Sequence, residues 1–205
     1  MAGSATMIGR MLPLDGISLG DLAKRSTQMD LKQVVGETPV LVFRPGPGDG
    51  PLLFVTPPDG EEIVEEGFLV ETQPTARRRR DPSARGYASP SAVVVALSKS
   101  NRNAEVDDEI IRVGRARTND IRLVSDQVSK VHGSFERVET VGTRTWHLVD
   151  QGSVNGTFIN GLRLDLGTAY AIRPGDEVRF ADVQAVFLDA EGLVSLCKEL
   201  TGEAR

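Results

Sequence analysis

The sequence predicts an all-β fold over its second half, a sandwich of about 11 short, mostly antiparallel strands. Between residues 93 and 190, runs of β-prone residues alternate with turn residues. Within the runs apolar and polar residues alternate, as where Val178 and Phe180 flank Arg179, which is typical of strands with one buried face. The 21 glycines and 11 prolines favour turns over long helices. The runs are AVVVALS, EIIRV, IRLV, HGSFERV, RTWHLVD, TFING, EVRF and QAVFL.

Residues 1–70 predict a small α+β extension before the sandwich. SLGDLAKRS reads as a helix that begins at Ser18, with Asp21 three residues later, and LKQVVG as a helical turn closed by Gly36. PVLVF and PLLFV flank RPGPGDG within residues 39–55, which favours a β-hairpin. The segment is too short to bury a large core alone, so we expect it to pack on another part of the chain.

Residues 71–92, ETQPTARRRRDPSARGYASPSA, contain almost no apolar side chains. Such a segment buries too little surface to offset its conformational entropy, so it is predicted to be a flexible linker. Its four consecutive arginines either keep the linker soluble or contact an acidic partner.

The last segment, 191–205, is predicted to contain a short amphipathic helix, because Leu193, Leu196, Cys197 and Leu200 recur at helical spacing. We expect this helix to pack on the sandwich, with Cys197 in the core. A single cysteine excludes an internal disulfide and a cysteine-rich zinc site, and it suits a reducing compartment.

Composition narrows the function class. The 205 residues carry a net charge of −5, which argues against a nucleic-acid partner for the whole chain. No apolar run approaches the roughly 18 to 20 residues that span a bilayer, and the N-terminus lacks the apolar region of a signal peptide. We therefore expect a cytoplasmic protein without a membrane partner. We identify no Ser/His/Asp arrangement of a catalytic triad, no cluster of metal ligands and no P-loop in the sequence. We therefore expect that the protein is not an enzyme and has no metal and no cofactor.

Four short motifs follow one another in the second half of the chain: the GR pair Gly114 and Arg115, NDI (119–121), SKVH (129–132) and DQGSVNGTFING (150–161). Each motif alone is weak. In this order, and among short predicted strands, the set resembles the forkhead-associated (FHA) family of phosphothreonine-binding domains. The resemblance covers about half of the chain.

The resemblance implies an FHA-like β-sandwich in residues 93–190 and a phosphopeptide-binding adaptor in Ser/Thr kinase signalling, with a protein kinase upstream. A phosphothreonine carries nearly two negative charges and three acceptor oxygens, so its site needs fixed guanidinium, hydroxyl or amide donors. By resemblance, Arg115 and Ser129 bind the phosphate, Lys130 adds charge, and Asn155 bonds the main chain of the peptide.

Two residues of the predicted specificity loops, Gln127 and Val154, are less typical. At the position of Val154 the family often has Ser or Thr, which adds a hydrogen bond to phosphate. A charge-assisted bond contributes about 1.5 to 3 kcal/mol, so the valine predicts weaker binding. Gln127 lies where the family reads a residue beyond the phosphothreonine, and a neutral glutamine indicates no preference.

Five motif residues are predicted to support the site. Gly114 is expected to let the backbone turn towards the peptide, and Asn119 to bond the loop backbone. The resemblance implies that His132 braces the arginine turn from behind, and no second metal ligand lies at a usable spacing from it. Gly156 and Thr157 are predicted to shape a tight hairpin.

Two other interpretations stay open. The sandwich could be a phospho-independent scaffold, for which Val154 and the unexplained residues 1–70 argue, or an enzyme.

The linker adds a hypothesis of its own, because Thr72, Thr75 and Ser83 are candidate phosphorylation sites and Ser83 follows a basic run. A phosphorylated Thr72 or Thr75 could bind the pocket of its own chain, since a tether of about 20 residues gives a high effective concentration. In the plainer interpretation they are ordinary polar linker residues.

Overall fold

The computed structural model describes six stretches of the chain: residues 16–26, 31–45, 53–55, 87–99, 110–140 and 143–202. Within them the strands form one seven-stranded and one six-stranded sheet. The first sheet has the order β1 (Ile17–Ser18), β4 (Val93–Ala96), β2 (Val40–Phe43), β13 (Val183–Leu188), β12 (Glu177–Phe180), β9 (Thr157–Ile159) and β10 (Leu162–Arg163). The second has the order β11 (Ala169–Ile172), β8 (Thr143–Asp150), β7 (Gly133–Thr140), β5 (Ile110–Gly114), β6 (Ile121–Leu123) and β3 (Leu53–Val55).

The predicted β-sandwich is confirmed, and its neighbouring strands pair antiparallel except β5 with β6, which are parallel. Every strand expected in the second half is present. The described part of residues 93–190 holds ten strands, β4 to β13, close to the expected number. Two of them had no run of their own in the sequence, because β10 has only two residues and β11, AYAI, lacks a strong β-type pattern. Short edge strands of this kind carry too few residues for their periodicity to stand out.

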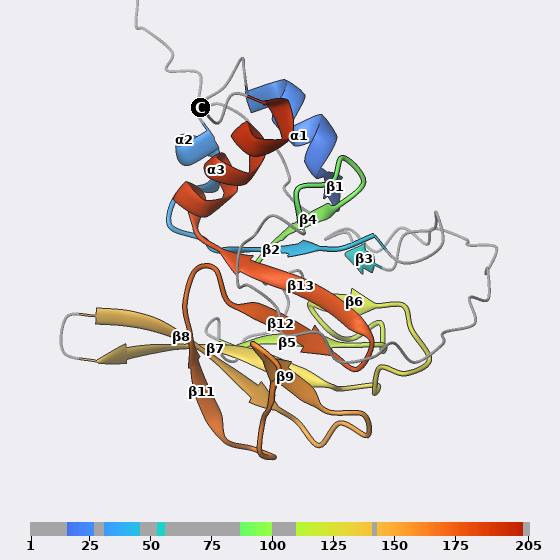
Figure 1. Cartoon of the computed structure of the whole chain (residues 1–205). Helices are drawn as coiled ribbons and strands as arrows, with labels where there is room; N and C mark the ends of the chain where they lie inside the picture. The colour runs from blue at the N-terminus through green and yellow to red at the C-terminus, as the bar shows by residue number, and fades with distance from the viewer. Residues whose placement is uncertain are drawn as a thin grey trace, which may run out of the picture.

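Three helices cover the outer face of the seven-stranded sheet: α1 (Leu19–Ser26), α2 (Leu31–Val35) and α3 (Ala190–Thr201) (Figure 1). The expected cap of α1 is formed, because Asp21 N–H donates to Ser18 Oγ and the Ser18 hydroxyl donates back to the carboxylate. Gly36 follows α2 with a φ of 61°, as a helix-ending glycine does. None of the helices in the described ranges is long and apolar enough to cross a membrane.

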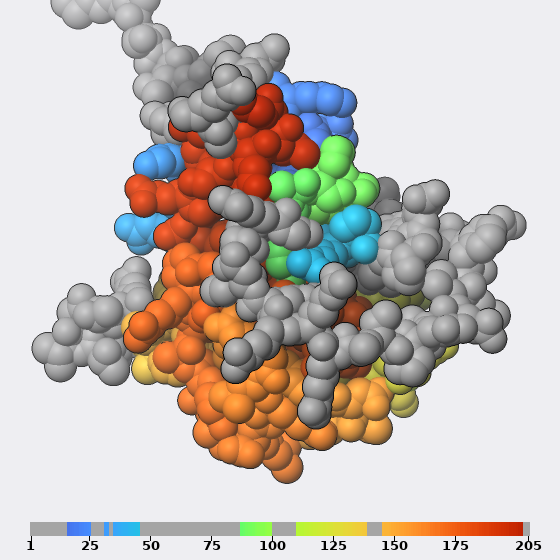
Figure 2. Space-filling view, in the orientation of Figure 1, coloured from blue at the N-terminus to red at the C-terminus, as the bar shows by residue number. Residues whose placement is uncertain are grey.

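The expected C-terminal helix is also confirmed. Leu193, Leu196 and Cys197 of α3 are buried together with residues of α1 and α2, and Figure 2 shows α3 and the N-terminal residues side by side on the surface. Burial raises the pKa of the Cys197 thiol to about 11, which keeps it in the unreactive thiol form. Cys197 is therefore a core residue, as predicted.

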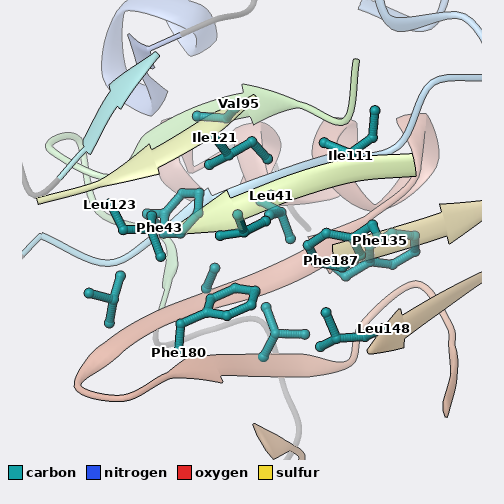
Figure 3. Packing of buried hydrophobic residues seen from close by; sticks show 14 of the residues in the cluster. Leu41, Phe43, Val95, Ile111, Ile121, Leu123, Phe135, Leu148, Phe180 and Phe187 are labelled. Carbon is teal, nitrogen blue, oxygen red and sulfur yellow. The ribbon is translucent and has the colours of Figure 1, made fainter. Parts of the chain in front are cut away.

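Two hydrophobic cores hold the layers together. The first lies between the sheets and contains a phenylalanine group, in which Phe135 stacks on Phe187 with ring centroids 6.3 Å apart and meets the edge of Phe180 at 6.1 Å (Figure 3). The second lies between the seven-stranded sheet and the helices. The N-terminal segment thus packs on the sandwich, as its small size requires.

Strand β2 joins the two cores. Leu41 and Phe43 point into the core between the sheets, whereas Val40 and Val42 point into the core beneath the helices. All four side chains are buried because the strand lies inside a sheet that is covered on both faces. β2 pairs with β4 on one side and β13 on the other, so it is a central strand of the sandwich.

The expected hairpin in residues 39–55 is therefore wrong. β2 belongs to the seven-stranded sheet, whereas β3 pairs with β6 in the other sheet. Proximity in sequence favours a hairpin, but pairing with β13 and β4 buries both faces of β2, which a hairpin with β3 alone would not do.

The predicted linker ends earlier than expected, because residues 87–92 are packed on the sandwich. Tyr87 is buried, its hydroxyl donates to Glu177 Oε2 at 3.0 Å, and the Arg44 guanidinium lies 4.2 Å from the centre of its ring. The low apolar content of the stretch concealed this single aromatic anchor. The rest of the linker, with Thr72, Thr75 and Ser83, lies outside the described residues, so the phosphorylation hypothesis stays a prediction.

The position of β2 makes a prediction about the smallest folding unit. A fragment of residues 93–190, the domain expected from sequence, lacks β2 and α3 and leaves a gap between β4 and β13. We expect this fragment to show no cooperative unfolding in urea, because both cores lose their shared strand. The fluorescence of Trp146, the one tryptophan, reports the transition, with the full chain as control. A cooperative transition of the fragment at the urea concentration of the full chain would contradict this role of β2.

Candidate functional site

Three loops carry the residues that the motifs single out. The first, residues 115–120, follows β5; the second, residues 124–132, joins β6 to β7; the third, residues 151–156, joins β8 to β9. The pairing of β5 with β7, and of β7 with β8, brings the ends of these strands to one end of the six-stranded sheet, where Val113 lies opposite Gly133 and Gly133 opposite Asp150.

Hydrogen bonds join the three loops directly. Arg115 N–H donates to the Ser129 carbonyl at 2.9 Å, and Ala116 N–H donates to the Lys130 carbonyl at 3.0 Å. Val154 N–H donates to Ser129 Oγ at 3.1 Å. The structure therefore brings the three predicted phosphate-binding residues, Arg115, Ser129 and Lys130, together with the predicted specificity residue Val154.

The Arg115 side chain is exposed and held at its base. Its Nε donates to the Val128 carbonyl at 3.3 Å, and the Arg115 carbonyl accepts from Arg122 Nε at 3.3 Å. Lys130 is exposed in the adjoining loop. Two cationic residues from neighbouring loops thus lie next to the half-buried Ser129, Arg115 through its backbone bond and Lys130 as the following residue, an arrangement that suits an anion with several oxygens.

Asn155, the predicted main-chain contact, lies beside Gln127. Its Nδ2 donates to the Gln127 carbonyl at 2.8 Å and to Gln127 Oε1 at 3.1 Å. Both residues are exposed. The second loop therefore fixes the orientation of the Asn155 amide from one side, and the two residues expected to meet a peptide are in contact.

Gly114 is required for a different reason than the sequence suggested. Its φ is not positive, so a special turn is not what demands glycine. A Cβ atom here would lie 2.5 Å from the Lys130 carbonyl and 3.0 Å from Asn119 Nδ2. Glycine thus allows the first and second loops to approach closely. The expected bonds of Asn119 strengthen this approach, since its Nδ2 donates to the carbonyls of Ala116 at 2.9 Å and Lys130 at 2.7 Å.

His132 connects the second loop to the third. Its side chain is 0% exposed, Nδ1 accepts a hydrogen bond from Ser129 N–H at 3.1 Å, and Nε2 lies 3.2 Å from the Gly156 carbonyl. A backbone N–H must donate and a carbonyl must accept, so the ring is neutral with its proton on Nε2. Burial lowers the pKa of His132, which keeps this neutral form. The His132 ring therefore bridges the second and third loops, whereas it was expected to brace the arginine turn of the first loop.

Asp150 organises the third loop, although sequence reasoning assigned it no role. Its buried carboxylate accepts from the N–H groups of Gly152 and Ser153 at 3.1 Å each, from the Ser153 hydroxyl, and from the Thr157 hydroxyl at 2.6 Å. Burial opposes ionisation, but the bonds from Ser153 and Thr157 outweigh it and lower the pKa of Asp150. An aspartate two residues before glycine is a turn signal that could have identified it.

Gly156 and Thr157 end this loop, which crosses from the six-stranded to the seven-stranded sheet, and they lead into the tight β9–β10 hairpin, whose turn lies at residues 160–161. Gly156 has a φ of 84°, and a Cβ atom here would lie 2.8 Å from Arg163 Nε, so both conformation and space favour glycine. Thr157 is fully buried and bonds Asp150. In the described part of the chain, no group of three His, Cys, Asp or Glu side chains is arranged to hold a metal ion.

The neutral His132 ring predicts how stability depends on pH. Its pKa is lower in the folded protein than in the unfolded chain, so protonation favours unfolding and stability falls as the pH drops below about 6.5. We expect the free energy of unfolding in urea to decrease between pH 7.5 and pH 5, and the decrease to shrink in His132→Gln, measured relative to its own value at pH 7.5.

The chain has two histidines, so His147→Gln is the matched control and should keep the decrease. The bonds of Asp150 are lost only at lower pH, because its pKa lies below the usual value near 4. An equal pH dependence in the wild type and His132→Gln would refute the assignment.

Comparisons with known proteins place this geometry in a family. Residues 111–181 match the family model of the FHA domain. The chain is 28% identical over 137 residues to the ABC transporter ATP-binding/permease protein Rv1747 of Mycobacterium tuberculosis, covering 65% of this chain and 15% of the transporter. It is 29% identical over 131 residues to the glycogen accumulation regulator GarA of the same species, covering 62% of this chain and 76% of GarA.

Solved structures of FHA domains share the fold at lower identity. The MEK1 FHA domain in complex with the HOP1 pThr318 peptide is 23% identical with a TM-score of 0.38, covering 47% of this chain and 87% of that chain. The yeast Dun1 FHA domain in complex with a doubly phosphorylated peptide is 19% identical with a TM-score of 0.43, covering 75% of each chain. Since the matched residues carry the four motifs up to Gly161 and the three connected loops, residues 111–181 of this chain are an FHA domain.

Proposed function

We propose that this protein binds phosphothreonine-containing segments of partner proteins through Arg115, Ser129, Lys130 and Asn155, as an adaptor that acts downstream of Ser/Thr kinases. The observation that carries the proposal is the direct bonding of the three loops that hold these residues. Arg115 N–H donates to the Ser129 carbonyl, and Ser129 Oγ accepts from Val154 N–H, next to Asn155.

The chemistry of the site suits a dianionic phosphate ester. Arg115 supplies a planar guanidinium that can bond two phosphate oxygens at once, and Lys130 adds a second positive charge. The Ser129 hydroxyl accepts from Val154 N–H, which leaves its own O–H proton to be donated to phosphate. The Arg115 and Ser129 side chains are already bonded to the loops before a ligand arrives, so binding has less to order.

Asn155 supports recognition of an extended peptide. Its Nδ2 is bonded to Gln127, which turns its Oδ1 away from that loop as an acceptor for a peptide N–H. A contact to the main chain is independent of the side chains of the ligand, so it holds the peptide while other residues determine preference.

The proposed role is binding and not catalysis. FHA domains are usually binding modules, and the family match brings no catalytic domain with it. The polar side chains at the centre of the site are used to fix loops: His132 by one bond within its own loop and one to the third loop, and Asp150 by bonds to the third loop that follows it. A buried neutral imidazole whose two nitrogens are both bonded is poorly placed to move a proton to a ligand.

Arg115→Ala tests the phosphate contact. We expect affinity for a phosphothreonine peptide to fall by at least about 100-fold, since the side chain would supply two charge-assisted hydrogen bonds. Isothermal titration calorimetry measures the change. Arg173→Ala is the matched control, because Arg173 is exposed just beyond β11, at the end of that strand remote from the third loop, and should leave affinity unchanged.

The same titration separates the proposal from a phospho-independent scaffold. A partner that binds equally well after phosphatase treatment, and equally well to Arg115→Ala, would establish the scaffold and exclude the phosphate site.

Val154→Thr tests the missing hydroxyl. The Val154 side chain is 81% exposed and its N–H is bonded to Ser129 Oγ, so a nearly isosteric threonine would present a hydroxyl beside the proposed phosphate. We expect affinity for the phosphothreonine peptide to rise about tenfold, the contribution of one hydrogen bond to a charged group. The unphosphorylated peptide should gain nothing. An equal gain for both peptides would show that Val154 does not face the phosphate.

A further inference from the structure

Three arginines lie in a row across the seven-stranded sheet. Arg44 directly follows β2, Arg179 lies on β12 and Arg163 on β10. Phe158 of β9 pairs with both Arg163 and Arg179, and Gln184 of β13 pairs with Arg179. Residues paired across neighbouring strands place their side chains on the same face. Arg44 joins this face through its Nη1, which donates to Gln184 Oε1 at 3.4 Å. We call the three arginines the arginine row.

The arginine row lies on the outer face of the sheet. Val178 and Phe180, the neighbours of Arg179 in β12, point into the core between the sheets, so Arg179 points away from that core. Val42, two residues before Arg44, lies in the core beneath the helices. The row therefore continues the outer face of the sheet beyond the core that the helices cover.

The row concentrates positive charge at fixed positions. Arg163 is exposed, whereas Arg44 and Arg179 are half-buried. The guanidinium of Arg179 lies 3.5 Å from the centre of the Phe158 ring, which holds it above its neighbouring strand. Neither Arg44 nor Arg163 forms an ion pair with a described residue. Such a row suits a ligand with several carboxylates, because a guanidinium and a carboxylate can form two parallel hydrogen bonds.

The spacing of the row indicates an extended ligand. The strands that carry the arginines are separated in each case by one other strand, β13 or β9. Neighbouring strands lie about 4.8 Å apart, so the arginines lie about 10 Å from one another and the row is about 19 Å long. A compact anion reaches one of them, whereas an extended acidic peptide reaches all three.

The chain contains an acidic segment of matching length. Residues 61–66, EEIVEE, carry four carboxylates in six positions and lie outside the described residues. Six extended residues span about 20 Å, and Glu62 and Glu65, three residues apart, would lie about 10 Å apart. The two residues between them are apolar, and Phe158 likewise lies between two arginines of the row.

The path of the chain favours this segment as the occupant. The described chain resumes at Tyr87, whose ring centre lies 4.2 Å from the guanidinium of Arg44, at one end of the row. Residues 67–86 join the segment to this anchor, and a tether of about 20 residues gives a high effective concentration. The other acidic run, residues 105–109 (EVDDE), directly precedes β5 of the six-stranded sheet.

We propose that the arginine row is a docking surface for residues 61–66 of the same chain, whose glutamates pair with the guanidiniums of Arg44, Arg179 and Arg163. One exposed ion pair contributes little to stability, but several charges in a matched line act as a network. The inference is independent of the proposed phosphothreonine site, because Arg115 and Ser129 lie on loops of the six-stranded sheet.

A spin label next to the segment tests the contact in the full chain. Gly67→Cys is labelled with a nitroxide, and the native Cys197 stays unlabelled because it is buried and its pKa is raised to about 11. We expect the label to broaden the backbone amide NMR signals of Phe158, Arg179 and Gln184. The broadening should weaken at 1 M salt, where the screening length is about 3 Å.

Removing the charges of the segment should abolish the broadening. This variant changes no described residue, so it leaves the sandwich intact, and it combines Glu61→Gln, Glu62→Gln, Glu65→Gln and Glu66→Gln. The matched control removes four charges from the other acidic run and should keep the broadening. It combines Glu105→Gln, Asp107→Asn, Asp108→Asn and Glu109→Gln.

The double variant Arg163→Gln and Arg179→Gln tests the row itself and should also lose the broadening, while the urea transition followed by Trp146 fluorescence checks that it is folded. No broadening in the wild type, or equal broadening after the glutamates of the segment are replaced, would refute the docking. Broadening that survives in the double arginine variant, or is lost equally in the control, would refute the arginine row as its surface.

Discussion

The candidate site depends on one buried imidazole. His132 accepts from the backbone of the second loop and donates to the backbone of the third, and the ring edge rests on Phe180 of the core between the sheets. Loops are ordinarily the mobile part of a sandwich. Here two of them are tied to the core and to each other through a single rigid ring, so the hydroxyl of Ser129 is held in place without help from a ligand.

Around this ring the remaining supports are short and local. Asp150 closes the third loop, Asn119 bonds the first loop to the second, and Gly114 removes the Cβ that would keep them apart. The groups proposed to meet a ligand, Arg115 and Asn155, lie at the outer edge of this arrangement. The inner residues are buried and support the loops, whereas the outer residues are exposed and are the ones proposed to meet a ligand.

The sequence predicts which loops carry these residues, because the motifs are local, although it assigned no role to Asp150. Glycine, asparagine and aspartate have specific conformational preferences in turns, so their spacing within a loop predicts the local backbone geometry. The strands of the second half were also predictable from their alternation. The errors arose where the outcome depends on distant residues. The composition of PVLVF does not indicate whether it pairs with PLLFV or lies between β4 and β13. Likewise, a single tyrosine in a polar stretch does not indicate that Tyr87 contacts Glu177 and Arg44.

The central position of β2 has a consequence for biosynthesis. Val40 pairs with Leu188 and Val42 with Val186, so β2 finds one of its two neighbours only after the residues between Phe43 and Val183 have been made. Pairing between such distant segments carries a large loop-closure entropy and is slow to form. During translation, the four apolar side chains of β2, which are buried in the folded protein, are not yet fully covered. We therefore expect β2 to be exposed to aggregation in a nascent chain until β13 emerges.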